Sequence, residues 1–147
     1  MAKKLAKIDT ERIENAVREI LIAVGEDVER EGLQDTPARV ARMYTELLRG
    51  MREDPKAHIR RVFHEQYDEI VLLRDIPFHS LCEHHILPYH GSAHIAYRPN
   101  DDVAGLSKLA RYVRWQSRRL TIQEGLTRDI ADGVAEEVDA EAVRVEI

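Results

Sequence analysis

Apolar side chains in the first part of the chain recur every three or four positions, which is the spacing of one face of an α-helix. A first stretch begins at Asp9 or Thr10, either of which can cap a helix, and Gly25 can end it. Its apolar positions are Ile13, Val17, Ile20, Leu21 and Val24. The pattern predicts one amphipathic helix.

A second helix is predicted to start at Thr36, which is a good N-cap, and Pro37 suits the first turn because its missing N–H is not needed there. The apolar stripe of this helix is formed by Val40, Tyr44, Leu47 and Leu48. Gly50 can stop it. Together the two stretches predict an N-terminal helical pair over residues 1–50.

The pattern then changes to that of strands. Residues 51–65 are charged and weakly patterned, so they predict a linker with at most a short helix. Residues 70–73 form a short apolar, partly β-branched run, and residues 92–98 alternate, with Ala93, Ile95 and Tyr97 on one face. Residues 99–102 are typical of a turn.

Two more helices and a strand are predicted in the C-terminal half. The third helix carries Leu106, Leu109, Ala110 and Val113, and the fourth carries Ile122, Leu126, Ile130, Val134 and Val138. Val143, Val145 and Ile147 alternate with charged residues in a strand pattern that runs to the last position. Either the chain is cut short or this is a short terminal edge strand. The order of the elements indicates an α+β fold.

Composition narrows the classes of function. The 147 residues fit a single domain, and 44% hydrophobic with 33% charged residues is typical of a soluble globular protein. A net charge of −5 argues against a general nucleic-acid binder. The basic stretch at residues 1–7 is followed by polar residues, so we expect no signal peptide and no membrane span. One cysteine is compatible with a cytoplasmic location.

The run Cys82-Glu83-His84-His85 is the most informative motif. A thiolate and an imidazole three residues apart can reach one metal ion, with Glu83 and His84 left beside it for acid–base work. A catalytic zinc usually takes three protein ligands, so two do not complete the site. The alternative for Cys82 is a small buried apolar residue.

Five stretches in one order resemble GTP cyclohydrolase I. They are residues 32–41 (GLQDTPARVA), 80–85 (SLCEHH), 91–97 (GSAHIAY), 105–111 (GLSKLAR) and 122–127 (IQEGLT). A Cys-x-x-His pair alone is common by chance, but five ordered blocks over residues 10–147 are specific. The resemblance implies the tunnelling fold, or T-fold, an antiparallel sheet with helices on one face. For this chain the resemblance implies a single domain over residues 1–147, with its T-fold core at residues 66–147.

The resemblance also implies a function. Members of the family open the guanine imidazole ring of GTP with the help of Zn²⁺, release C8 as formate and form 7,8-dihydroneopterin triphosphate, a precursor of folate and other pterins. They assemble as decamers, with active sites between subunits. We therefore expect GTP as the substrate and a homo-oligomer.

The same resemblance assigns roles to residues. Cys82 and His85 are implied as zinc ligands, and His84, with Glu83 beside it, as the catalytic histidine. Gln123 and Glu124 match the pair that recognises guanine. Family positions that hold the triphosphate are matched by Arg39, Arg42, Lys108 and Arg111, with a hydroxyl from Ser107. For Gln123, Glu124 and each basic residue taken alone, solvated surface is the alternative. For His84 the alternative is a surface histidine or a hydrogen-bonded core histidine.

The chain departs from the family in two ways. Gly125 stands where the family usually has arginine, which places a poor helix former inside a predicted helix. The sequence also ends in the strand that leads to the family's next motif, which carries the third zinc ligand, a cysteine. We therefore expect the third ligand and the C-terminal portion of the core to be absent from this chain. The third ligand would then have to be His79, His90, His94, a carboxylate or water.

Three hypotheses follow from these features. The first is GTP cyclohydrolase I, for which these 147 residues alone are expected to hold zinc weakly and release little formate. The second is a catalytically incomplete GTP-binding paralogue or fragment that acts as a partner or regulator of a complete enzyme. The third, a different pterin or deazapurine enzyme of the same fold, is disfavoured by the residue blocks around Cys82 and Ser107.

Overall fold

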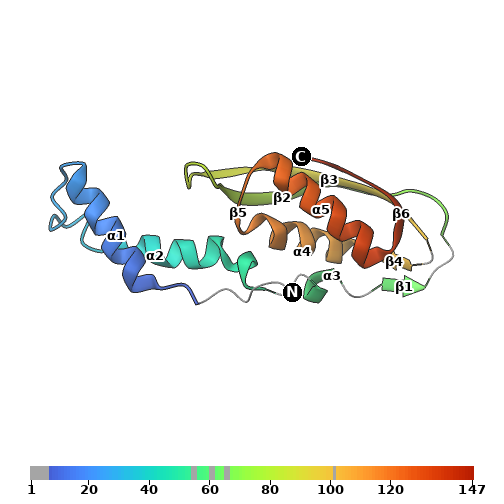
Figure 1. Cartoon of the computed structure of the whole chain (residues 1–147), viewed down its shortest axis with the longest axis horizontal. Helices are drawn as coiled ribbons and strands as arrows, with labels where there is room; N and C mark the ends of the chain where they lie inside the picture. The colour runs from blue at the N-terminus through green and yellow to red at the C-terminus, as the bar shows by residue number, and fades with distance from the viewer. Residues whose placement is uncertain (1–6, 54–55, 60–61, 65–66, 101) are drawn as a thin grey trace. The chain divides into compact units, whose positions relative to one another are not determined.

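The structure is a computed structural model that describes residues 7–53, 56–59, 62–64, 67–100 and 102–147. Residues 1–6 of the basic N-terminal stretch lie outside the described residues. The chain divides into two compact units, Met1–Leu48 and Arg49–Ile147 (Figure 1). This boundary lies close to the predicted end of the helical pair. That the whole chain forms a single domain stays a prediction.

The first unit contains the two predicted helices, α1 (Thr10–Ala23) and α2 (Thr36–Leu47), which contact each other. The start of α1 is confirmed, since the Asp9 carboxylate accepts a hydrogen bond from the Arg12 backbone N–H at 3.0 Å. The predicted N-cap of α2 is wrong by one residue, because Thr36 is already helical and Asp35 occupies the cap. The Thr36 hydroxyl instead donates to the Gly32 carbonyl at 3.5 Å.

Within the described part of the chain, no helix is both long enough and apolar enough to cross a membrane.

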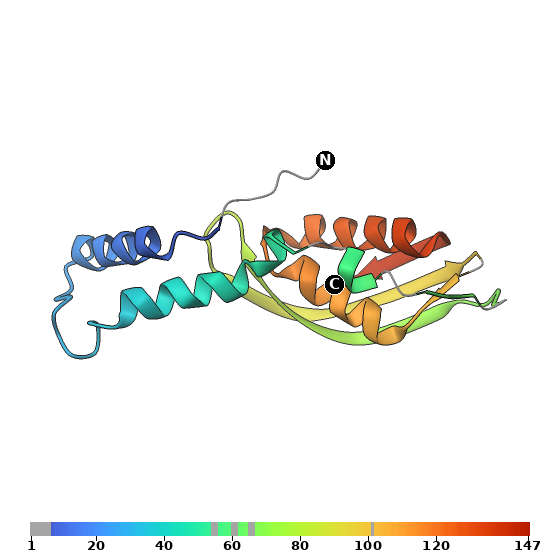
Figure 2. The ribbon, with the colours of Figure 1, turned by 90° about the horizontal axis from the view of Figure 1, so that it is seen from below.

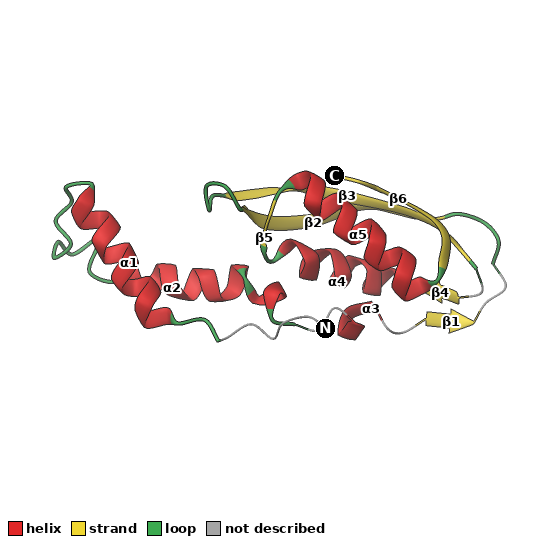
Figure 3. Cartoon of the chain, in the orientation of Figure 1, coloured by secondary structure: helices red, strands yellow, loops and turns green. Residues whose placement is uncertain are grey.

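The second unit is built on a four-stranded sheet in the order β5-β2-β3-β6 (Figure 3). Its strands are β2 (Val71–Cys82), β3 (Pro88–Pro99), β5 (Leu120–Thr121) and β6 (Ala140–Glu146). β3 pairs antiparallel with β2 and with β6, as predicted. The short β5 pairs parallel with the end of β2, so the sheet is mixed at that edge.

Two helices, α4 (Leu106–Ser117) and α5 (Gln123–Val138), cover one face of this sheet (Figure 2). The predicted inward-facing residues of β3 are buried, and they form the core with apolar residues of both helices. The largest fully buried members of this core include Tyr97, Ile95, Leu109, Leu126, Ile130, Val113, Val134 and Val138. The α+β prediction, with helices on one face of the sheet, is therefore confirmed.

The segment before β2 is more structured than predicted. It contains the 3-10 helix η1 (Arg49–Met51), the four-residue helix α3 (Lys56–Ile59) and β1 (Val62–His64), which pairs antiparallel with β4 (Asp102–Ala104). Residues 54–55, 60–61 and 65 of the predicted linker, and residue 101 of the predicted turn, lie outside the described residues. Elements of three or four residues are too short to show a period in sequence.

β2 is also much longer than the predicted run at residues 70–73. Its register shifts between Leu73 and Ile76, where Asp75 has φ +58° and its N–H donates to Nδ1 of His94 at 3.2 Å. Such a bulge moves later side chains to the other face, which hides the alternation from a sequence pattern. The strand continues beyond the bulge and ends at Cys82.

Helix α5 approaches α4 closely at Gly133. A Cβ at this position would lie 1.6 Å from the Tyr112 hydroxyl oxygen, which is hydrogen-bonded to Gln116 and Asp129. We expect Gly133→Ala to lower the free energy of unfolding by about 3 kcal/mol, because overpacking adds to lost hydrogen bonds. Chemical denaturation measures this effect. Gly32→Ala is the control, since its Cβ meets only the tip of Arg30, and equal losses in both variants would contradict the prediction.

Candidate functional site

The Cys82–His85 motif forms a tight turn at the end of β2. The Cys82 N–H donates to the Leu87 carbonyl at 2.8 Å, and the Ile86 N–H donates back to the Cys82 carbonyl at 2.8 Å. Ile86 adopts a left-handed backbone conformation, with φ +58°. These bonds hold the motif in the turn that connects β2 to β3, so its side chains stay close together.

Cys82 and His85 converge within this turn. The Cys82 Sγ and His85 Nδ1 atoms lie 3.7 Å apart. Two ligands of a tetrahedral zinc, with Zn–S of about 2.3 Å and Zn–N of about 2.0–2.1 Å, lie about 3.6 Å apart. This donor pair therefore has the spacing that one zinc ion requires. Cys82 is only partly buried, which favours a ligand over the apolar alternative.

The three histidines considered as a third ligand lie elsewhere. His79 and His90 are paired across β2 and β3, with ring centroids 5.9 Å apart, and both are exposed. His94 lies beside Asp75, about 20 Å along the strand from Cys82 at the usual rise per residue. Among the described residues, no group of three or more His, Cys, Asp or Glu side chains is placed to hold a metal.

His84 and Glu83 lie beside the donor pair and face solvent. The His84 Nε2 atom is 3.9 Å from a Glu83 carboxylate oxygen, and the two side chains are 63% and 47% exposed. The His84 and His85 rings meet edge to face, with centroids 6.2 Å apart. Both residues are thus accessible to a substrate that approaches the turn.

Strand β5 links this turn to helix α5. The Glu83 N–H donates to the Thr121 carbonyl at 3.3 Å, and Cys82 is paired with Thr121 in the sheet. Helix α5 begins two residues later, so its first turn lies near the motif. A groove of about 330 Å³ runs between them, lined by Glu83, Arg119, Leu120, Thr121, Ile122, Glu124, Gly125, Arg128 and Asp129.

Gly125 leaves this groove open. A Cβ at position 125 would approach the Thr121 hydroxyl to 3.1 Å, so any side chain here would crowd the groove wall. Helix α5 nevertheless continues through Gly125 from Gln123 to Val138. The departure from the family pattern therefore changes the groove without breaking the helix.

The two residues of the predicted guanine pair point differently. Glu124 lines the groove, whereas the Gln123 side-chain amide donates to the Ile147 carbonyl at 2.7 Å. Successive helix residues are about 100° apart around the axis, so neighbours in sequence do not share a face. The structure thus brings Glu124, but not Gln123, together with Glu83.

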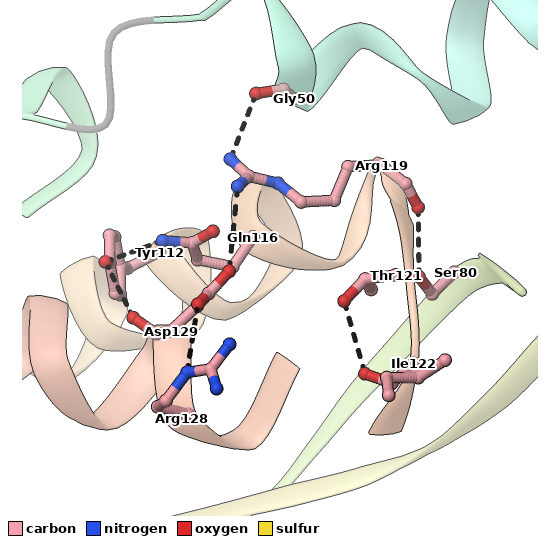
Figure 4. A network of polar contacts seen from close by, with 9 residues as sticks. All are labelled: Gly50, Ser80, Tyr112, Gln116, Arg119, Thr121, Ile122, Arg128 and Asp129. Carbon is pink, nitrogen blue, oxygen red and sulfur yellow. Dashed lines mark hydrogen bonds and ion pairs between the residues drawn. The ribbon is translucent and has the colours of Figure 1, made fainter. Parts of the chain in front are cut away.

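A polar network connects residues that line the groove to neighbouring elements of the same unit (Figure 4). The Arg119 guanidinium lies 4.4 Å from the Trp115 ring centroid and 3.9 Å from the Asp129 carboxylate, and it donates to the Gly50 carbonyl at 3.4 Å. Burial lowers the pKa of Arg119, and the Asp129 charge opposes that shift. The Ser80 hydroxyl also donates to the Arg119 carbonyl at 3.2 Å, which ties β2 to the residue before β5.

Tyr89 is a site residue that the sequence analysis missed. It lies on β3 opposite Ser80, and burial raises the pKa of its hydroxyl, with smaller contributions from Cys82, Glu124 and Glu83. Because Ser80 comes two residues before Cys82 on β2, this pairing puts Tyr89 beside the Cys82–His85 turn. Nothing in the strand pattern distinguishes this tyrosine from other half-buried aromatic residues.

The residues predicted to hold the triphosphate fall in both units. On α4, Arg111 lies four residues after Ser107 and three after Lys108, so it is on the same side of the helix as each of them. Arg39 and Arg42 are exposed on α2, and Arg39 pairs with Asp35 at 3.0 Å. That all five residues gather around one triphosphate stays a prediction.

A cysteine and a histidine that converge at a strand end, beside a groove lined by charged residues of both signs, fit a metal-dependent enzyme that acts on a polar substrate. Comparison with known proteins identifies the family within this class. The family model of GTP cyclohydrolase I matches residues 13–147. The chain belongs to the GTP cyclohydrolase I family.

Individual relatives agree with this assignment. GTP cyclohydrolase 1 of Rhodopirellula baltica is 55% identical over 139 residues, which are 95% of this chain and 61% of the relative. The proteins of the same name from Lysinibacillus sphaericus and Carboxydothermus hydrogenoformans are 54% and 52% identical. The matches cover 97% and 95% of this chain, and 76% and 73% of those relatives. The chain thus spans 61% to 76% of the length of these three relatives, and less than two thirds of the first.

Proposed function

We propose that this protein acts as a GTP cyclohydrolase I, opening the guanine imidazole ring of GTP to release formate and form 7,8-dihydroneopterin triphosphate. The observation that carries the proposal is the 3.7 Å approach of Cys82 Sγ to His85 Nδ1 beside the groove that holds Glu83 and Glu124. Family membership suggests the reaction class, and this geometry supports the proposed roles of Cys82 and His85.

Zinc fits the donor set at the turn. Cys82 and His85 would hold it, because a thiolate and an imidazole are the ligands that zinc prefers and their spacing is suitable. When bound, zinc lowers the pKa of water enough to make it a nucleophile at neutral pH. Two protein donors hold zinc less firmly than the usual three, so we expect weak binding by these 147 residues.

The chain's own residues bind the base and move protons. Glu124 would accept hydrogen bonds from the ring N–H and exocyclic amine of guanine, since a carboxylate has two acceptor oxygens. His84, exposed at the turn, would exchange protons with the purine ring and the ribose, and Glu83 would orient it. Gln123 would contribute to guanine recognition only after releasing the Ile147 carbonyl.

The triphosphate would be held by basic residues and one hydroxyl. These are Ser107, Lys108 and Arg111 on α4 with Arg39 and Arg42 on α2. Guanidinium groups suit this role because they bind phosphate oxygens in pairs. By family membership we also infer a cytoplasmic homo-oligomer, a decamer, with active sites at the interfaces between subunits.

Formate release from GTP tests the proposal. We expect the purified protein to release formate at a low rate that rises with zinc concentration, because zinc is the weakly held component. His84→Ala, which leaves Cys82 and His85 in place, should abolish that release without lowering zinc binding. The proposal fails if GTP neither binds nor yields formate at any zinc concentration, or if formate forms equally well without zinc.

A further inference from the structure

The groove that holds Glu124 is lined by charges of both signs. Its charged residues are three carboxylates and two guanidinium groups, from Glu83, Glu124, Asp129, Arg119 and Arg128. Three carboxylates disfavour a phosphate group here, whereas the mixture suits a ligand with hydrogen-bond donors on one edge and acceptors on another. Guanine is such a ligand. Its donors have a proposed partner in Glu124, and its acceptors still require one.

The two arginines of this groove differ in how far they are already engaged. The Arg119 side chain is 24% exposed, lies over the Trp115 ring and donates to the Gly50 carbonyl at 3.4 Å. The Arg128 side chain is 73% exposed, and its Nε atom lies 3.9 Å from an Asp129 carboxylate oxygen (Figure 4). Within the described part of the chain, the Arg128 guanidinium donates no hydrogen bond. Its donors are therefore available to a ligand.

Arg128 also lies one helical turn from Glu124. Residues four apart on a helix share a face, with Cβ atoms about 5–6 Å apart, and a glutamate followed by an arginine at this spacing commonly forms an ion pair. Among the described residues no ion pair joins these two side chains, although both line the groove. Gly125 has no side chain to fill the groove beside them. The carboxylate and the guanidinium thus line one groove without neutralising each other.

Asp129 orients the Arg128 guanidinium. Because the Asp129 carboxylate is approached by Nε, the two terminal NH₂ groups of Arg128 remain for a ligand. Asp129 is itself held in place, since Arg119 Nη1 lies 3.9 Å from its carboxylate and the Tyr112 hydroxyl donates to its carbonyl at 3.3 Å. An arginine that is oriented in advance loses less freedom on binding.

We propose that Arg128 determines base specificity, by donating hydrogen bonds to O6 and N7 of the guanine whose N1–H and amino group bind Glu124. Guanine presents these two acceptors side by side, and the planar arginine fork matches them. The two edges of the base meet at O6, so side chains one helical turn apart are suitably spaced to bind both. Adenine has an amino group in place of O6, which Arg128 would reject. The proposal rests on the proposed function, because it takes GTP as the ligand of this groove.

Calorimetric titration with GTP and 7-deaza-GTP, without zinc so that GTP is not consumed, tests the proposal. 7-Deaza-GTP carries carbon in place of N7 and so lacks one of the two acceptors. We expect the wild-type protein to bind GTP about fivefold more tightly than 7-deaza-GTP. Arg128→Ala should remove that preference and weaken GTP binding by about tenfold. Alanine suits an exposed helix position, so the fold should be kept.

Arg144→Ala is the matched control, since Arg144 is exposed on β6, does not line the groove and loses the same charge. It should bind both nucleotides like the wild-type protein. Inosine triphosphate separates the two edges of the base: Arg128→Ala should still prefer GTP over it, because Glu124 still binds the amino group. An unchanged preference for GTP over 7-deaza-GTP in Arg128→Ala, or an equal loss in Arg144→Ala, would overturn the proposal.

Binding and formate release are measured separately, so this proposal and the proposed function can fail independently. Predicted base preferences without any formate release in the presence of zinc would support the role of Arg128 and reject the proposed reaction. Formate release by a protein whose Arg128→Ala variant binds GTP like the wild type would support the reaction and reject the role of Arg128. No binding of GTP would overturn both.

Discussion

Replacing Cys82 with serine is expected to lower zinc affinity by at least about a hundredfold and to bring zinc-dependent formate release below detection. A serine hydroxyl is a poor zinc ligand at neutral pH, whereas the cysteine thiolate is a strong one. Loss of groups that merely orient a ligand already costs 10–100-fold, and loss of the ligand itself costs more. Zinc binding measured by competition with a chelating dye checks this expectation.

The substitution has little reason to destabilise the protein. Cys82 is only partly buried, and its backbone N–H and carbonyl bonds to Leu87 and Ile86 are kept. His90→Asn is the matched control, because His90 is exposed and stacks on His79 away from the turn. Unchanged zinc affinity in Cys82→Ser, or an equal loss in the control, would remove Cys82 from the metal site.

The second large effect is expected at Glu124. Glu124→Gln should weaken GTP binding about thirtyfold, since a hydrogen-bonded charged group contributes about 2 kcal/mol. The loss should be specific for the base: wild-type protein should prefer GTP over inosine triphosphate, which lacks the exocyclic amine, and the variant should lose that preference. Calorimetric titration with both nucleotides measures the difference.

Glu136→Gln serves as the control for this experiment. Glu136 is an exposed carboxylate on the same helix, and it does not line the groove. Its replacement removes the same charge at a position with no expected substrate contact. An equal loss of GTP binding in both variants would show that Glu124 acts only through its negative charge and not through contact with guanine.

The long helices could be predicted from the sequence because their apolar stripes repeat over several turns. The helix capped by Asp9 and the buried face formed by Ala93, Ile95 and Tyr97 lie where the pattern predicts them. The bulge at Asp75 changes which side chains of β2 face the core and so interrupts the alternation of apolar and polar positions. For this reason most of β2 was not predicted from the sequence. The two-residue β5 has no pattern at all, yet its pairing with β2 brings α5 to the turn.

The candidate site could be predicted only in part. The Cys82–His85 pair is local, so sequence spacing was enough to anticipate its convergence. Gln123 and Glu124 are adjacent in sequence but point to different surroundings, which resemblance alone does not reveal. Arg119 and Gly50 are 69 positions apart in the sequence, and only the tertiary fold brings them together beside the groove.

Substitution of cobalt for zinc tests the central claim most directly, because a thiolate bound to Co²⁺ gives a charge-transfer absorption that an unbound thiolate does not. The account predicts that Co²⁺ produces this band with the wild-type protein, that Cys82→Ser abolishes it, and that His85→Asn weakens the metal affinity by at least about tenfold. His90→Asn should leave both unchanged. No thiolate band in the wild-type protein, or a band whose metal affinity is the same without His85, would contradict a metal site built on Cys82 and His85.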